Sequence, residues 1–201
     1  MMKMMQTVLQ VKKGETPGEE NKDDDMDLDG VGCTANVVLI DHDQRKLFVA
    51  NAGDSRCILG HGGKCLPLSK DHKPDDPIEI KRIEAAGSTV NEQGRVDGNL
   101  NLTRALGDLR YKKKDLPAED HPITANPDTF EYEMPADLDF IFMGCDGVWE
   151  RKSNDEMCEW IYSKLKGDKK SADLNAICTD LLKNECLSHN HAETCKLLQL
   201  E

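Results

Sequence analysis

Short apolar runs separated by glycine turns fill the middle of this chain, and they constrain its fold more than any other feature. Such runs, bounded by Gly, Asn or Asp, are typical of β-strands. The segments with this pattern are Gly32–Ile40, Lys46–Asn51, Cys57–Leu59 and Lys64–Leu68. A short polar connection joins the first two segments and another joins the last two, so each pair is predicted to form a β-hairpin.

Helical signals follow these strands and then dominate the end of the chain. Asp76 can cap a helix that starts at Pro77 and ends before Gly87. Later, Ser153 and Glu156 stand three residues apart, the spacing of a capping box. The sequence therefore predicts one helix in the middle of the chain and another that begins just after position 153.

A polar loop is predicted between Lys112 and Asp128, before the helix at 153. A final helix is predicted to begin at Ser171. Apolar residues at helical spacing mark the buried faces of the last two helices, and we interpret both stripes as core packing. These residues are Met157, Trp160, Ile161, Leu165, Leu174, Ile177, Cys178, Leu181 and Leu182. Strands that come before helices predict an α+β fold or a layered sandwich, not alternating βαβ units.

A carboxylate at the end of a further apolar run is the strongest candidate for a functional side chain. The run from Phe140 to Gly144 indicates a buried strand, and it leads into Cys145, Asp146 and Gly147. A buried carboxylate is costly unless it is paired or bound to a metal, so this position indicates a ligand site. The alternative is a solvent-exposed turn, which is the commoner use of an Asp-Gly pair.

The same arrangement occurs earlier, where the strand 46–51 runs into Gly53 and Asp54 before the next strand starts. A plain hairpin turn would explain Asp54 alone. Two Asp residues at strand ends favour a site for a hard cation, because Mg²⁺ and Mn²⁺ prefer carboxylate and water oxygens.

A net charge of −12 argues against nucleic acid and against anionic membranes as partners. Much of this charge lies between Gly14 and Asp29, a segment that is rich in acidic residues and has almost no apolar residues. Such a segment cannot offset the entropy of ordering, so residues 14–30 are predicted to be an acidic disordered linker. A solvating loop and a docking tail for basic proteins are the two alternatives. Residues 1–13 form a short N-terminal segment, with a helix as one reading.

The 8 cysteines include no Cys-x-x-Cys pair. Cys145, Cys158 and Cys178 stand where apolar core residues are expected, which favours reduced, buried thiols in a cytoplasmic or nuclear protein. The first 13 residues are too polar for a signal peptide, and no apolar run is long enough to span a membrane.

Six short motifs, in this order, resemble those of the metal-dependent 2C-type (PPM) serine/threonine protein phosphatases. They cover about Gly32 to Leu187 and are far more specific together than singly. The acidic segment and Leu116–Asp120 look most like the gamma-isoform branch. The motifs are Gly32-Cys33-Thr34-Ala35, Val49–Arg56, Lys70-Asp71-His72-Lys73-Pro74, Glu84–Ser88, Thr103–Asp108 and Cys145–Trp149.

The resemblance implies an α+β fold in which two antiparallel sheets form a layered β-sandwich flanked by helices. It also implies hydrolysis of phosphoserine and phosphothreonine in proteins by a water bound between two Mn²⁺ or Mg²⁺ ions. By this resemblance, Asp146 would bind a core metal, and Asp54 would bind a third, weaker metal shared with Asp146. Gly147 and Glu150 would support that site, although Glu150 stands where the family usually has Asp or Asn.

Residues about 70–98 resemble the family's flap beside the substrate cleft. Within it, Asp71 and His72 would orient the flap rather than carry out chemistry. Arg56, Arg104 and Asp108 belong to family motifs, and a structural salt bridge and a catalytic role are both open for them.

Two parts of the family's metal site are not found in the sequence. An Asp-Gly-His-Gly-type motif with the bridging Asp is absent, and His189–Cys195 replaces a terminal Asp-Asn segment. The resemblance therefore predicts a partial phosphatase domain at 31–188, incomplete in its N-terminal half, and a divergent tail at 189–201. Either the chain is a phosphatase by family, or it is a non-catalytic fragment or pseudophosphatase that acts as a binding module. His189, His191 and Cys195 are a weak zinc alternative, because structural zinc sites use four ligands.

Overall fold

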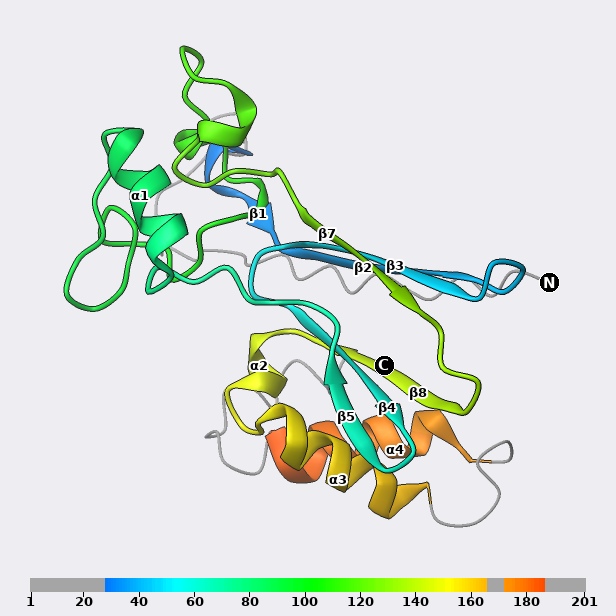
Figure 1. The fold of residues 1–201 in the computed structure, drawn as a ribbon. Coiled ribbons are helices and arrows are strands. Elements are labelled where there is room, and N and C mark those ends of the chain that lie inside the picture. The colour runs from blue at the N-terminus through cyan, green and yellow to red at the C-terminus, as the bar shows by residue number, and fades with distance from the viewer. Residues whose placement is uncertain (1–27, 166–171, 187–201) are drawn as a thin grey trace. The chain divides into compact units, whose positions relative to one another are not determined.

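Two units make up the fold of the chain, for which a computed structural model describes residues 28–165 and 172–186 (Figure 1). The first unit comprises the described residues up to Arg56 together with Ser69–Met134. The second comprises Cys57–Leu68 together with the described residues from Pro135 onward. The predicted N-terminal segment 1–13, residues 14–27 of the acidic linker, the tail 189–201 and the zinc alternative lie outside the described residues.

A three-stranded antiparallel sheet forms the centre of the first unit. Its strands are β2 (Ala35–Asp41), β3 (Lys46–Ala52) and β7 (Asp128–Glu133), in the order β2-β3-β7. Val49 of β3 pairs with Val38 on one side and with Phe130 on the other. The hairpin predicted from the first two apolar runs is therefore confirmed, and β7 is a strand that the sequence reading did not include.

The predicted strand 32–40 is interrupted at Thr34. Its first residues form β1 (Gly32–Cys33), which pairs with β6 (Leu106–Gly107) in a separate two-stranded sheet. Gly107 has a positive φ of 73°, and a Cβ there would lie 2.4 Å from the Val31 carbonyl oxygen. A side chain at this position would collide with the backbone, so the β1–β6 pairing requires glycine here.

Helix α1 (Pro77–Ala85) begins and ends where the sequence predicts. The Asp76 side chain accepts a hydrogen bond from the Ile78 N–H at 2.9 Å, and Pro77 occupies the first turn. Ile83 of α1 is fully buried and packs in a cluster with Val96, Ala105, Tyr111 and Ile123. The 3₁₀ helices of this unit are η1 (Leu28–Gly30), η2 (Leu109–Tyr111) and η3 (Ala118–Asp120).

The second unit is a sheet covered by helices. Its strands lie in the order β5-β4-β8, with β4 at Arg56–His61, β5 at Lys64–Pro67 and β8 at Leu138–Gly144. β4 and β5 form the second predicted hairpin. The helices are α2 (Asp146–Trp149), α3 (Asn154–Lys164), α4 (Leu174–Asp180) and the π-helical η4 (Leu181–Cys186).

The core of this unit joins the sheet to the helices. Ile58 of β4 packs with Val148 and Trp149 of α2 and with Met157 and Ile161 of α3. The predicted stripe of α3 thus lies on its buried face. Antiparallel strands with helices packed on them confirm the predicted α+β class.

The prediction for the last helix was wrong in two respects. α4 begins at Leu174, and Asp173 caps it through a hydrogen bond from the Ala176 N–H, so the cap is not Ser171. Cys178 is exposed, and Leu182 is 43% exposed, whereas Leu181 is buried. Leu174, in the α-helical part, is also 64% exposed, so the predicted stripe is not a single buried face. The chain changes to π-helical turns at residue 181, where a 3.6-residue spacing no longer applies.

The capping box of α3 gives a direct test of this local structure. Ser153 Oγ accepts from the Glu156 N–H, and the Ser153 N–H donates to Glu156 Oε2 at 2.8 Å. We expect Ser153→Ala to lower the free energy of unfolding by about 1 kcal/mol, because the Glu156 N–H in the first turn of the helix loses its side-chain acceptor. Ser163→Ala on the exposed side of the same helix is the matched control, and equal urea midpoints for the two variants would contradict this assignment.

No helix among the described residues is long and apolar enough to cross a membrane.

Candidate functional site

The turn between β3 and β4 holds Asp54 in a fixed position. Gly53 has a positive φ of 113°, and a Cβ at this position would lie 2.4 Å from Thr34 Cγ2 and 2.9 Å from the Arg104 carbonyl oxygen. Glycine is therefore required here both for its dihedral angle and for space. The turn leaves Asp54 only 4% exposed, so the predicted ligand position is a buried carboxylate.

Lys73 neutralises that carboxylate. Its ammonium group donates a hydrogen bond to Asp54 Oδ2, and the lysine side chain is 31% exposed whereas that of Asp54 is 6% exposed. A buried carboxylate needs such a partner, because the cost of desolvation would otherwise disfavour its charged form.

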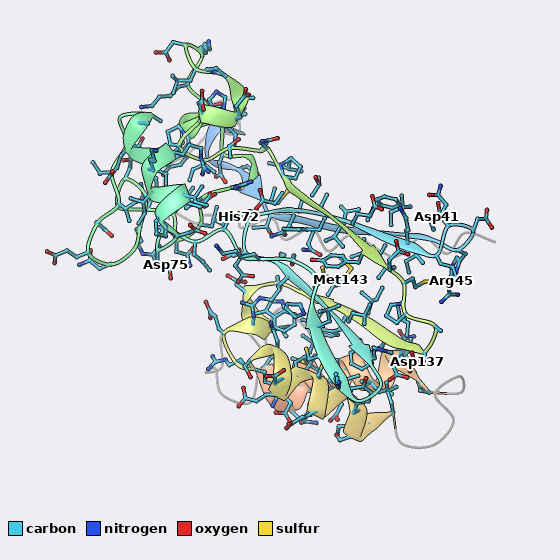
Figure 2. All side chains as sticks on the ribbon, viewed as in Figure 1. Asp41, Arg45, His72, Asp75, Asp137 and Met143 are labelled. Carbon is cyan, nitrogen blue, oxygen red and sulfur yellow. The ribbon has the colours of Figure 1, made fainter. Side chains whose placement is uncertain are left out.

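His72, which Figure 2 labels, connects the segment before α1 to this turn. The His72 N–H donates to the Gly53 carbonyl at 3.1 Å, and the Gly53 N–H donates back to His72 Nδ1 at 3.1 Å. Because Nδ1 accepts a hydrogen bond, the ring proton is on Nε2, which lies 3.1 Å from Asp128 Oδ2. His72 thus connects the Asp54 turn to β7.

Arg56 pairs with Asp71. Arg56 Nε donates to Asp71 Oδ1 at 2.8 Å, and Nη2 donates to Oδ2 at 2.7 Å, which is a bidentate arrangement. The hydrogen bonds that Arg56 donates to Asp71 raise the pKa of Arg56. In this structure the arginine of the Asp-Ser-Arg motif therefore has a salt-bridge partner inside the first unit.

Arg104 is the centre of a buried ionic network. Its guanidinium contacts Glu79 at 2.6 Å and Asp128 at 2.7 Å. Glu79 is 1% exposed and also pairs with Arg82 at 2.7 Å, while Thr103 Oγ1 donates to it at 2.5 Å. Burial raises the pKa of Glu79, but the hydrogen bonds from these two arginines and the threonine outweigh it and lower the pKa to about 2.

Asp108 lies at the corner formed by β1 and β6. It has a left-handed φ of 50°, it is 7% exposed, and its N–H donates to the Val31 carbonyl at 2.8 Å. Its carboxylate covers Gly32 so closely that a Cβ there would lie 2.1 Å from Oδ2. Burial raises the pKa of Asp108.

Asp146 lies in the second unit, where it is the first residue of α2. Its Oδ1 accepts from the Gly147 N–H at 2.8 Å, and its carbonyl accepts from the Glu150 N–H at 2.8 Å. The Trp149 indole donates to the Gly144 carbonyl at 2.8 Å, which fixes the end of β8 against this helix.

The prediction that Asp146 ends a buried strand needs correction. Every residue of β8 and Asp146 itself is partly exposed, and Gly147 and Glu150 are exposed. The carboxylate is therefore accessible at a strand-to-helix turn. Because the carboxylate is accessible, the cost of burying a charge gives no reason to infer a bound ion. The assignment of Asp146 as a metal ligand therefore rests on its motif alone.

The described residues do not by themselves fit a two-metal centre. Asp54 belongs to the first unit and Asp146 to the second, and no group of three or more His, Cys, Asp or Glu side chains in the described ranges could hold a metal ion. A hard cation takes six or more oxygen ligands, and Asp54 Oδ2 already accepts from Lys73. The metal roles of Asp54 and Asp146 remain predictions.

Sequence reasoning missed three charged residues that organise the first unit. Lys73 was part of a quoted motif without a role, and Glu79 and Asp128 were not singled out at all. Lys73 and Asp54 lie 19 positions apart, and Arg104 and Glu79 lie 25 positions apart. No local spacing rule identifies such pairs. For Asp128, the alternation of Phe130 and Tyr132 with polar residues is a strand signal that could have located β7, but the sequence analysis did not use it.

Comparison with known proteins relates this chain to one family. The family model described as Protein phosphatase 2C matches residues 5–194, a longer stretch than the motifs covered. Probable protein phosphatase 2C 21 of Arabidopsis thaliana is 41% identical over 177 residues, which is 88% of this chain and 48% of that protein. Protein phosphatase 1G of Homo sapiens is 42% identical over 176 residues, covering 86% of this chain and 31% of that protein.

A Drosophila melanogaster relative, probable protein phosphatase CG10417, is 45% identical over 160 residues, covering 79% of this chain and 23% of that protein. The chain therefore spans less than half the length of these curated relatives.

Solved structures agree. A phosphatase from Toxoplasma gondii has a TM-score of 0.61 at 33% identity, over 69% of this chain and 42% of that one. A C. elegans sex determining protein has a TM-score of 0.66 at 27% identity, over 78% of this chain and 38% of that one. With six motifs, a family match over most of its length and this structural likeness, the chain belongs to the protein phosphatase 2C family.

Proposed function

We propose that this protein is a metal-dependent serine/threonine phosphatase, which hydrolyses phosphoserine and phosphothreonine in protein substrates. The observation that carries the proposal is the family match over residues 5–194. The Asp54 turn supports it, because Gly53 and His72 hold a buried carboxylate at the position that the family motif predicts as a ligand.

Mg²⁺ or Mn²⁺ is the proposed metal, because carboxylate oxygens are ligands that these hard cations prefer. When bound, such ions activate water and stabilise charge on a phosphoryl group. Asp54 and Asp146 are the proposed ligands from this chain. A hard cation takes six or more oxygen ligands, so neither carboxylate alone completes a metal site.

The experiment that tests the proposal is a chimera with a relative. Residues 31–188 of this chain replace the matching segment of the Arabidopsis relative, and turnover of a phosphothreonine peptide is measured with Mn²⁺ and after chelation. We expect Mn²⁺-dependent turnover from the chimera. We expect turnover at background level from the 201-residue chain alone, because its described donor set is incomplete.

Two results would count against the proposal. A folded chimera without metal-dependent turnover would contradict the assigned function. Metal-dependent turnover by the 201-residue chain alone would contradict the inference that its ligand set is incomplete.

A further inference from the structure

Two cysteines of the second unit lie against each other. Cys65 is on strand β5 and Cys158 is on helix α3, and both are free thiols. Cys65 packs against the hydrophobic cluster to which Cys158 belongs. The two thiols also share a hydrogen bond, so their sulfur atoms are direct neighbours although they are far apart in the sequence.

The first turn of α3 holds the Cys65 thiol in place. Its Sγ donates a hydrogen bond to the Asn154 carbonyl oxygen at 3.3 Å. Asn154 and Cys158 are one helical turn apart on the same face of α3, and helical side chains lean toward the N-terminus of their helix. The Cys158 thiol is therefore directed toward the level at which Cys65 is held.

The two thiols differ in exposure and in acidity. Cys158 is 3% exposed, whereas Cys65 is partly exposed. Burial raises the pKa of both thiols, and their shared hydrogen bond counteracts this rise for Cys65 but adds to it for Cys158. Cys65 is thus the thiol that an oxidant reaches first and that forms a thiolate more readily. Cys158 is the buried neighbour that can react with the oxidised sulfur of Cys65.

We propose that Cys65 and Cys158 form a disulfide bond when the chain is exposed to hydrogen peroxide. The Cys65 thiolate attacks one peroxide oxygen, the O–O bond breaks, and the hydroxide that leaves takes up the thiol proton as water. The Cys158 sulfur then attacks the resulting sulfenic sulfur. The S–O bond breaks, and the second hydroxide leaves as water with the Cys158 proton. Two thiols are oxidised to one disulfide while one peroxide is reduced to two waters.

This bond connects a sheet edge to the helical layer. Within the described residues β5 pairs only with β4, in the strand order β5-β4-β8. α3 belongs to the same core as Val148 and Trp149 of α2. A covalent link between β5 and α3 restricts the unfolded chain, so oxidation stabilises the second unit. The thiol pair Cys65–Cys158 is then a redox-sensitive lock, and it does not rest on the proposed function.

The test is a peptide map of the 201-residue chain after treatment with hydrogen peroxide and alkylation of the remaining thiols. Trypsin places the two cysteines in separate peptides, 65–70 and 153–164, each with a single cysteine. We expect mass spectrometry to find these two peptides joined, by a bond that dithiothreitol cleaves. We also expect the oxidised chain to melt at least about 4 °C above the reduced chain.

Cys178→Ser is the matched control, because Cys178 is an exposed thiol on α4 of the same unit. This variant should keep both the joined peptides and the rise in melting temperature, and Cys65→Ser should lose both. In wild type, Cys178 reports the oxidant dose. Oxidation of Cys178 while Cys65 and Cys158 stay free thiols would overturn the proposal.

Two further outcomes would also overturn it. One is a joined pair without any rise in melting temperature, since the bond would then not lock the unit. The other is a map in which Cys65 or Cys158 is joined mainly to a different cysteine. The wild-type map and its melting temperature need no variant, so they decide the matter even if Cys65→Ser does not fold.

Discussion

Glu79→Ala is expected to lower the free energy of unfolding of the first unit by about 3 kcal/mol. Removing one partner of a buried ion pair typically costs about 3 to 5 kcal/mol, because the remaining charge stays buried without compensation. The lower end applies here, since Arg104 keeps Asp128 and Arg82 keeps backbone acceptors at Thr103 and His121. Urea unfolding measures the effect.

Glu84→Ala is the matched control, because Glu84 lies on the exposed side of the same helix. A change within about 0.5 kcal/mol is expected there. If both substitutions cost the same, then the loss at Glu79 reflects the helix rather than the ionic network.

Acid should weaken the contribution of Glu79 in a defined range. The pKa of Glu79 in the folded chain is about 2, below its ordinary value of 4.5. The folded state therefore favours the carboxylate, and this stabilisation is fully present above pH 4.5 and is lost as the pH falls toward 2. The shift corresponds to about 3 kcal/mol, the same size as the loss expected for Glu79→Ala.

The difference in unfolding free energy between wild type and Glu79→Gln should accordingly be constant near neutral pH and shrink between pH 4.5 and 2. A difference that does not change over this range would show that Glu79 is not held as a carboxylate by Arg104 and Arg82.

Local signals in the sequence predicted the parts of the fold that depend on neighbours within a few residues. Asp76 and Ser153 cap their helices through hydrogen bonds two and three positions away, and both caps are present. The glycine turn at Gly53 was also visible. Ser171 failed as a cap because Asp173 competes for the same role, and residue type alone does not decide between two good cap residues.

The ionic pairs could not be predicted because they depend on how distant segments meet. Glu79 looks like an ordinary helix glutamate, yet the fold buries it against Arg104, 25 positions later. Lys73 follows His72 in a recognisable motif, but its contact with Asp54 exists only because the segment docks on the β3–β4 turn. The candidate site was thus found by its motifs, while its electrostatic surroundings required the structure.

Asp146→Ala in the chimera with the Arabidopsis relative is the second large effect that we expect. A metal ion contributes several kcal/mol of transition-state stabilisation in phosphoryl chemistry, and about 1.4 kcal/mol corresponds to a factor of ten in rate. Loss of a core ligand should therefore lower Mn²⁺-dependent turnover at least about 100-fold. Because Asp146 is partly exposed and its side-chain hydrogen bond is to the adjacent Gly147 N–H, the fold should tolerate the change.

Asp75→Ala is the control for this measurement, since Asp75 is an exposed carboxylate before α1 (Figure 2). The most direct test of the central claim is the turnover of a phosphothreonine peptide by the parent chimera and these two variants across a Mn²⁺ titration. If Asp146 is a metal ligand of the phosphatase, turnover should be lost in Asp146→Ala and normal in Asp75→Ala. Equal turnover and equal Mn²⁺ dependence in all three proteins would contradict it.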